Sequence, residues 1–198
     1  MKRISLLLLF LIFCMLSVSV SAEWQQCPIS GSSSTISFPE SCYVFYEGMP
    51  DTDMAQKVLG GPTSAVIDYI KQQGAVCLAV FDTFETEVSV SLNPMVVPLN
   101  FSDISLLDLK NAAKDLASQF SNNGAVNVTY TSRSINGIHF IEIEYEMLLS
   151  SETDHRLVYY ATTADGNSMF MIVFTSINKP FSDSDRLLFQ DICGTLTI

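Results

Sequence analysis

Hydrophobic and polar residues alternate most regularly in the second half of the chain, where they predict consecutive strands. Within 138–147 the odd positions from Ile141 onward are apolar, and glutamates occupy the even positions between them. The segments 155–162 and 169–177 are of strand length and place apolar residues at every second position. Asp165-Gly166, between those two segments, is a strong signal for a two-residue hairpin turn. The second half is therefore predicted to be an antiparallel meander.

A turn centred on Asp165-Gly166 determines which residues of the two flanking strands face each other. It pairs three apolar residues with three others on one face, namely Ala161 with Phe170, Tyr159 with Ile172 and Leu157 with Phe174. The remaining side chains of 169–177 include Met169, Met171 and Val173, so this strand is predicted to be central and covered on both faces. For the preceding hairpin, a turn near Ser150 predicts that His155 lies opposite Met147 and that Arg156 lies beside Glu146.

Shorter patterns predict helices as well as strands. Strands are expected at 35–38 and 42–46, helices at 53–59 and 62–74, and a hairpin at 75–81 and 87–92. The clearest helix follows a loop with two prolines, because Ser105 is a good cap and Leu106 and Leu109 begin an apolar stripe at helical spacing. A last helix is expected from Ser182 through Ile192. The predicted class is α+β, a mostly antiparallel sheet with helices packed on its faces.

The first 22 residues have the parts of a secretory signal. Lys2-Arg3 is basic, 4–16 is apolar, and Val20-Ser21-Ala22 ends in the small residues that signal peptidase accepts. The apolar run is too short to span a bilayer, so we expect cleavage, a secreted or extracytoplasmic mature chain and no membrane span in that chain. The expected organisation is a signal at 1–22, an N-terminal arm at 23–34 and one α/β domain at 35–198.

Composition narrows the classes of partner. Hydrophobic residues make up 48% of the chain, which is ample for a core. Loss of Lys2 and Arg3 with the signal leaves 8 basic against 21 acidic residues, a net charge of −13. Such a negative field repels the phosphates of nucleic acids and anionic lipids, so no nucleic acid is expected as a partner. Cations and basic proteins are favoured instead.

Four cysteines follow the signal, namely Cys27, Cys42, Cys77 and Cys193. No two have the C-x-x-C spacing of a zinc knuckle or a thioredoxin-type motif. An even number in an exported chain predicts up to two disulfide bonds in one of three connectivities, with buried unpaired thiols as the alternative. Joining the two cysteines near the termini, and the two on predicted strands, gives Cys27–Cys193 and Cys42–Cys77 as the preferred pairs.

Glu142, Glu144 and Glu146 form the densest polar row, with neighbouring Cα atoms about 7 Å apart on one strand face. This row is the predicted contact for a basic surface of a partner. The same spacing would serve a paired-carboxylate hydrolase, which also needs a cleft. The loops around Asp51 and Pro94 are the alternative places for a partner.

No other residues form a recognisable catalytic or metal-binding motif. His139 and His155 are the only histidines, and no H-x-x-x-H or comparable spacing joins them. The chain also has no G-x-S-x-G nucleophile elbow and no phosphate-binding glycine loop. We therefore predict no catalytic residue, no metal and no cofactor.

The order of elements resembles the PsbP-like (Mog/DcrB-like) α/β/α sandwich group, in particular its exported bacterial members. The resemblance covers about residues 34–198 and rests on Phe38-Pro39, Tyr43-Val44-Phe45, Leu106-x-x-Leu109, three long strands and a final helix from Leu187 to Cys193. That group includes extrinsic photosystem subunits, a nuclear-transport cofactor and bacterial envelope proteins. The resemblance implies a non-enzymatic domain that binds a protein or cell-surface component, with any disulfide a local addition. A small hydrolase and a structural accessory domain are the alternatives.

Overall fold

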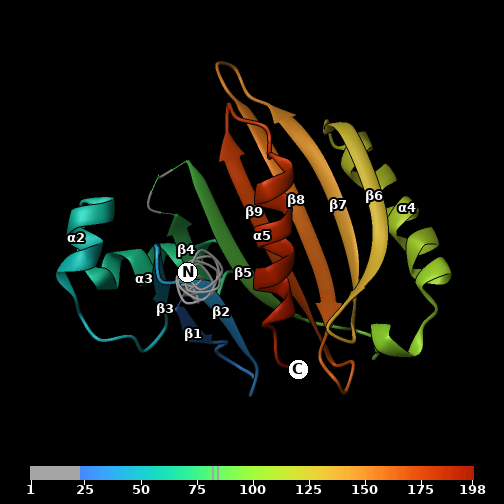
Figure 1. Cartoon of the computed structure of the whole chain (residues 1–198), viewed down its shortest axis with the longest axis horizontal. Helices are drawn as coiled ribbons and strands as arrows, with labels where there is room; N and C mark the ends of the chain where they lie inside the picture. Colours follow the sequence, from blue (N-terminus) through green and yellow to red (C-terminus); the bar gives the residue numbers. More distant parts are fainter. Residues whose placement is uncertain (1–22, 82, 84) are drawn as a thin grey trace, which may run out of the picture.

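An antiparallel sheet of seven strands forms the centre of the molecule in the computed structural model, which describes residues 23–81, 83 and 85–198. The strands are β3 (Cys42–Tyr46), β4 (Cys77–Phe81), β5 (Thr86–Pro94), β6 (Val126–Ile135), β7 (Ile138–Leu148), β8 (Thr153–Thr162) and β9 (Ser168–Ile177). Their order across the sheet is β3-β4-β5-β9-β8-β7-β6 (Figure 1). The signal predicted at 1–22 lies outside the described residues.

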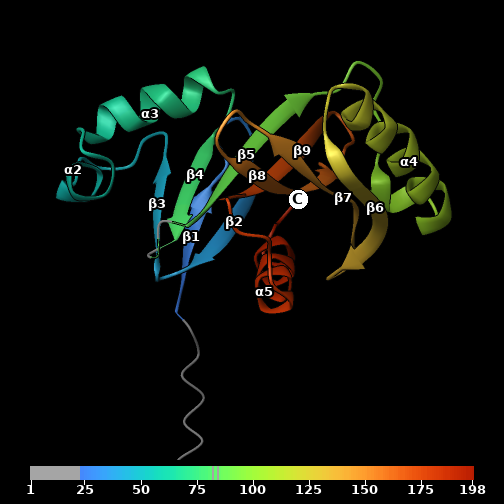
Figure 2. The same cartoon turned by 90° about the horizontal axis from the view of Figure 1, so that it is seen from above.

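Helices cover both faces of this sheet. One face carries α2 (Asp53–Leu59), α3 (Thr63–Gln72) and α4 (Leu106–Asn122), with the short 3-10 helix η1 (Phe101–Asp103) leading into α4. The other face carries α5 (Asp183–Gly194) and a separate two-stranded ribbon of β1 (Trp24–Pro28) and β2 (Thr35–Pro39), as Figure 2 shows. This arrangement confirms the predicted α+β class and the mostly antiparallel sheet with helices packed on it.

The face beneath α5 has the register that the sequence predicts. Ala161 pairs with Phe170, Tyr159 with Ile172 and Leu157 with Phe174, and all six side chains are buried in one cluster. Phe189 of α5 stacks on Phe174 with ring centroids 4.0 Å apart. β9 lies between β5 and β8, which confirms that it is a central strand. Its other face is covered only in part, because Met169, Met171 and Val173 are half-buried.

The opposite face is packed by two separate helical groups. Ser105 caps α4 by accepting the Asp108 backbone N–H at 3.2 Å, and the buried Leu109 and Ala113 pack in one cluster with residues of β7 and β8. Val66 and Ile70 of α3 pack with residues of β3 and β4 at the other end of the sheet. The central strands β5 and β9 therefore lie between the two helical groups on this face.

Three expectations about strands are corrected by the structure. The expected arm at 23–34 contains β1, which pairs with β2. β6 was not predicted, although Val126, Val128 and Tyr130 alternate with polar residues at its start. In the β7–β8 hairpin His155 lies opposite Glu146, and Met147 lies opposite Asp154, so the predicted pairing was wrong by one residue. The connecting loop closes through a hydrogen bond from Leu149 N to Glu152 O. A change of one residue in the pairing of two strands moves each β8 side chain opposite a β7 residue of the other face.

The preferred disulfide pairing is also wrong. Cys42 lies opposite Phe81 and Cys77 opposite Tyr46, so the two cysteines are at opposite ends of the β3–β4 ladder, about 13 Å apart along the strands. That separation is far beyond the reach of a disulfide bond. The Cys27 sulfur lies 3.0 Å from the Cys77 sulfur, and Cys27 and Cys193 are both unbonded thiols, so the predicted Cys27–Cys193 bond is not formed. Within the described residues the structure contains no disulfide bond.

Candidate functional site

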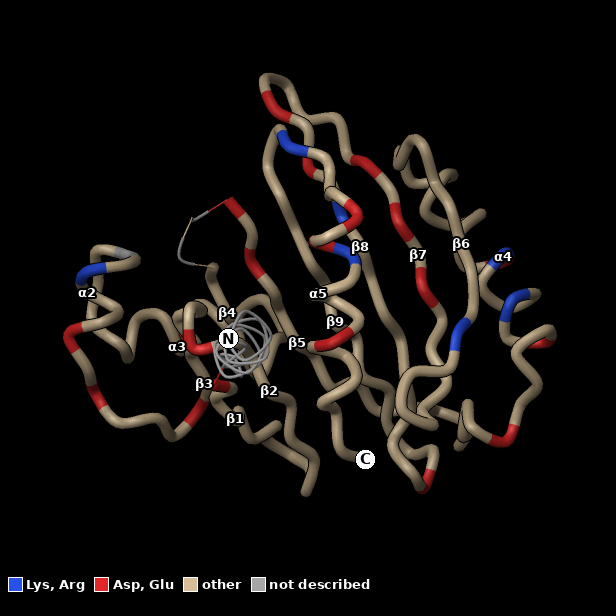
Figure 3. The backbone as a smooth tube through the Cα atoms, in the orientation of Figure 1, with Lys and Arg blue, Asp and Glu red and all other residues tan. Residues whose placement is uncertain are grey.

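The acidic row on β7 lies beside α5, on the same face of the sheet as that helix. Glu142 is opposite Tyr159 and Glu144 is opposite Leu157, and both of these β8 residues belong to the core cluster beneath α5. Figure 3 shows the acidic positions following one another along β7. The alternation read from the sequence therefore placed the three carboxylates correctly on one face.

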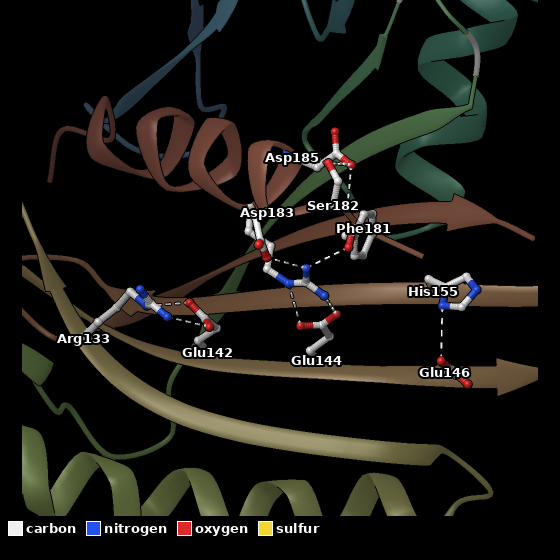
Figure 4. Close-up of polar contacts among 10 residues, drawn as sticks. Arg133, Glu142, Glu144, Glu146, His155, Phe181, Ser182, Asp183 and Asp185 are labelled. Atoms are coloured by element: carbon white, nitrogen blue, oxygen red, sulfur yellow. Dashed lines mark hydrogen bonds and ion pairs between the residues drawn. The ribbon is translucent and has the colours of Figure 1, made fainter. Parts of the chain in front are cut away.

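Each carboxylate of the row is engaged by a residue of the same chain. The partners are Arg133 for Glu142 at 2.8 Å, Arg186 for Glu144 at 2.6 Å and His155 for Glu146 at 3.4 Å (Figure 4). Asn127 also donates to Glu146, at 2.8 Å. These partners come from β6, β8 and α5. The row therefore ties the edge of the sheet to its neighbours and to the helix above it, and arginines pair with two of its three carboxylates.

The contact with α5 is fixed by the way that helix begins. Ser182 and Asp185 form a capping box, in which each side chain accepts the other's backbone N–H. Arg186, in the first turn, donates to Phe181 O at 2.7 Å and to both oxygens of Glu144. The Glu144 carboxylate raises the pKa of the Arg186 guanidinium. A two-pronged contact of this kind orients α5 on β7.

Both histidines contact groups of the same chain that belong to the fold. His139 Nδ1 lies 3.1 Å from the backbone oxygens of both Phe101 and Ile104, so it holds η1 against the sheet. His155 faces Glu146. No three His, Cys, Asp or Glu side chains gather as metal ligands in the described ranges 23–81, 83 and 85–198. The role of the acidic row in binding a partner remains a hypothesis.

A groove lies over the central strands, on the same face of the sheet as α3 and α4, where neither helix covers it. Its volume is about 270 Å³, with Tyr69 and Gln73 of α3 on one side and Met171 and Val173 of β9 in its floor. The floor is unusually polar for a sheet interior, since Glu87, Ser89, Ser91, Arg156 and Thr175 also line it. The sequence signal for this groove is the alternation of Glu87, Ser89 and Ser91 with apolar residues.

Two charged groups meet in this groove. Thr175 of β9 is paired with Glu87 of β5 on one side and with Arg156 of β8 on the other. Arg156 also donates to the Asp154 carboxylate at 2.8 Å. Desolvation raises the pKa of Glu87, although the residue as a whole is exposed along the groove, and the nearby Arg156 only partly offsets this effect. The buried Arg156 Nε has no hydrogen-bond partner in the described part of the chain. The groove is thus lined mainly by polar and charged side chains and offers little apolar surface to a ligand.

The loop at 95–99, which follows β5, presents the most exposed apolar side chains. Val96 is 99% exposed, Val97 70% and Leu99 44%, and Pro98 between them is also exposed. Contiguous exposed apolar side chains often mark an interaction site on a protein surface. The sequence placed a loop here and named the surroundings of Pro94 as an alternative partner site.

This loop is held in place by the β8–β9 turn. Met95 N donates to Asn167 O at 2.8 Å, and Leu99 N donates to Gly166 O at 3.0 Å. The turn is itself ordered by Asp165, which accepts from Thr163 and Asn167, and these hydrogen bonds lower the pKa of Asp165 to about 2. Both ends of the loop are therefore fixed, and the apolar side chains between them are held outward on an ordered backbone.

No protein-family model matches this chain. A search of curated proteins likewise finds no match. None of the helices within residues 23–81, 83 and 85–198 is long and apolar enough to cross a membrane.

Several solved structures have a similar arrangement of elements. The Ran-binding protein Mog1p of Saccharomyces cerevisiae is 10% identical, with a TM-score of 0.48 over 90% of this chain and 96% of that chain. LpqN, involved in cell envelope biogenesis of Mycobacterium tuberculosis, is 8% identical, with a TM-score of 0.46 over 89% and 92%. A protein of Bacteroides thetaiotaomicron is 14% identical with a TM-score of 0.45, and this chain covers 44% of it.

The Mog-like group that the order of elements resembles is thus represented among these structures. This chain spans less than half of the Bacteroides protein but nearly all of the other two. At such identities and TM-scores, the likeness says nothing of what this chain binds. Its function has to be inferred from its own surface.

Proposed function

We propose that this protein is a non-enzymatic binding domain, exported by the predicted signal at 1–22, and that its 95–99 loop inserts into an apolar pocket of a partner protein. The observation that carries the proposal is the exposure of Val96, Val97 and Leu99 on a loop fixed at both ends. A preorganised loop loses little conformational entropy on binding, so its apolar area contributes to affinity more fully than that of a mobile one.

A protein is a better partner for this loop than a lipid surface or a nucleic acid. The 21 acidic residues, against 10 basic ones in the full chain, produce a field that repels anionic headgroups and phosphates. An apolar pocket on a protein presents no such charge. The secreted or envelope location is part of this proposal and follows from the signal pattern.

The acidic row supports binding less well than the loop does. Arg133 and Arg186 already pair with Glu142 and Glu144, so a basic partner would have to displace contacts within the domain. The same pairing disfavours the hydrolase alternative, because each carboxylate is already committed to a contact that orders the fold. A purely structural accessory domain would have no use for the exposed apolar loop.

The proposal is tested with a pair of matched double variants. Val96→Ser/Val97→Ser removes the apolar tip, while Leu148→Ser/Leu149→Ser alters the exposed pair in the β7–β8 hairpin, where Leu148 is 62% and Leu149 52% exposed. Each protein is immobilised and incubated with the envelope fraction of its native cell. We expect the wild type and the Leu148/Leu149 variant to retain the same partner, and the Val96/Val97 variant to lose it.

Two outcomes would contradict the proposal. Retention of the same proteins by all three chains would place the contact elsewhere, and retention by none would argue against a binding domain. Size-exclusion chromatography of the purified chains gives a further check. A wild-type dimer that the Val96/Val97 variant dissociates would assign the loop to self-association and would overturn the proposal of a different partner.

A further inference from the structure

Two cysteines from different sheets meet in the core. Cys27 lies on β1 of the two-stranded ribbon, Cys77 lies on β4 of the main sheet, and both side chains are fully buried. Their sulfur atoms are 3.0 Å apart. A disulfide bond needs about 2.0 Å between the sulfurs, so a movement of about 1 Å would join them.

We propose that Cys27 and Cys77 form a structural disulfide bond that fastens the β1–β2 ribbon to the main sheet. Among the described residues, the ribbon shares no strand ladder with the seven-stranded sheet. It is held instead by buried apolar side chains, among them Ile36 and Phe38, and by hydrogen bonds to the end of the chain, such as those from Ser37 N to Thr195 Oγ1 at 2.7 Å and from Thr35 N to Thr197 Oγ1 at 2.9 Å. The bond would add a covalent link between β1 and β4.

The bond forms by exchange with an external disulfide, of a small molecule such as oxidised glutathione or of an oxidoreductase. One cysteine thiolate attacks the external disulfide and releases one thiol, which leaves a mixed disulfide on the protein. The second cysteine then attacks that mixed disulfide and releases the second thiol. In total Cys27 and Cys77 lose two electrons and two protons, and the external disulfide is reduced to two thiols.

Burial determines when this exchange occurs. The reactive species is the thiolate, and burial raises the pKa of the Cys77 thiol well above its ordinary value. Reaction is therefore favoured before the ribbon docks, while both sulfurs are accessible. Once formed, the bond is shielded by the same burial, which suits a permanent fastening better than a redox switch.

Cys193 provides a matched control. Its thiol is also fully buried, and burial raises its pKa in the same way, but it lies on α5 near Glu142 and Arg133. Replacing Cys193 with Ala therefore removes a buried thiol without touching the Cys27–Cys77 contact.

The test is disulfide mapping of the full chain, unfolded, reduced and refolded with oxidised glutathione. Free thiols are blocked with N-ethylmaleimide and the protein is digested and analysed by mass spectrometry. We expect a linked peptide pair containing Cys27 and Cys77, about 2 Da lighter than the two reduced peptides together. The linked pair should persist in Cys193→Ala and be absent from Cys77→Ala.

Thermal unfolding gives an independent readout. Reduction should lower the Tm of the wild type and of Cys193→Ala by roughly 5–15 °C and leave the Tm of Cys77→Ala unchanged. Recovery of both Cys27 and Cys77 as maleimide adducts would overturn the proposal, as would a link from either one to another cysteine. The wild-type map decides the question even if Cys77→Ala fails to fold.

Discussion

At the scale of single residues, stacked and edge-on aromatic rings hold α5 on the sheet. Phe174 stacks on Phe189 and meets the edge of Tyr159, while Phe170 lies fully buried on the same face. Removing a large buried side chain forfeits its transfer free energy and leaves a cavity, so the cost exceeds that of any surface change.

Phe170→Ala should therefore lower the free energy of unfolding by about 3–5 kcal/mol. Leu187→Ala is the control, because Leu187 belongs to α5 but is 63% exposed, and its effect should stay within about 0.5 kcal/mol. Urea unfolding measures both values. A loss below about 1 kcal/mol for Phe170→Ala would contradict the assignment of this face as the core.

Glu87 gives a residue-scale prediction that depends on pH. Because its pKa is raised in the folded protein, the folded state holds this proton more tightly than the unfolded state does. The wild type therefore loses stability as the pH rises from the ordinary glutamate pKa through the raised value. Glu87→Gln lacks this loss, so the variant's stability relative to the wild type should increase between pH 4 and pH 7. A relative stability that stays constant or falls over that range, measured by urea unfolding, would contradict the shift.

At the scale of elements, Gly166 couples the β8–β9 turn to the apolar loop. Its φ is +69°, and a Cβ there would lie 2.7 Å from the backbone carbon of Leu99. Gly166→Ala should therefore push the two segments apart, lower the Tm and speed hydrogen exchange at the Leu99 amide, which donates to Gly166 O.

Gly124→Ala is the control for this change. Gly124 also has a positive φ, +94°, but a Cβ there would meet nothing within 4 Å, so it tests backbone strain without the clash. The Leu99 amide should exchange as in the wild type in this variant. Equal acceleration by both substitutions would show that the turn does not hold the loop.

The elements themselves differ in how far the sequence could predict them. The β8–β9 register was predictable because a turn centred on Asp165-Gly166 and the apolar alternation give the same pairing. The connection itself is longer than the predicted two-residue turn, since Thr163 N donates to Ser168 O. The β7–β8 register was missed because Ser150 and its neighbours give no turn signal strong enough to determine the loop length. The fixed ends of the 95–99 loop depend on backbone hydrogen bonds to a distant turn, which no pattern of side chains reveals.

At the scale of the whole molecule, the two candidate surfaces predict different responses to salt. Contacts made by Glu142, Glu144 and Glu146 would act through charge, and binding would weaken as the Debye length falls to about 3 Å near 1 M salt. Apolar insertion of the loop should be unaffected or strengthened. We expect partner retention to persist at 1 M sodium chloride, and complete release at that concentration would favour the acidic row.

The central claim is that the 95–99 loop is the surface that contacts a partner, and site-specific photocrosslinking tests it most directly. A photoreactive amino acid replaces Val97 in one chain and Leu149 in a second, since both positions are exposed. Each chain is produced and irradiated in its native cell, and a third chain combines the probe at 97 with Val96→Asp. The account predicts one adduct of defined mass at position 97, weakened by Val96→Asp and absent at position 149. No adduct at 97, or the same adducts at both positions, would contradict it.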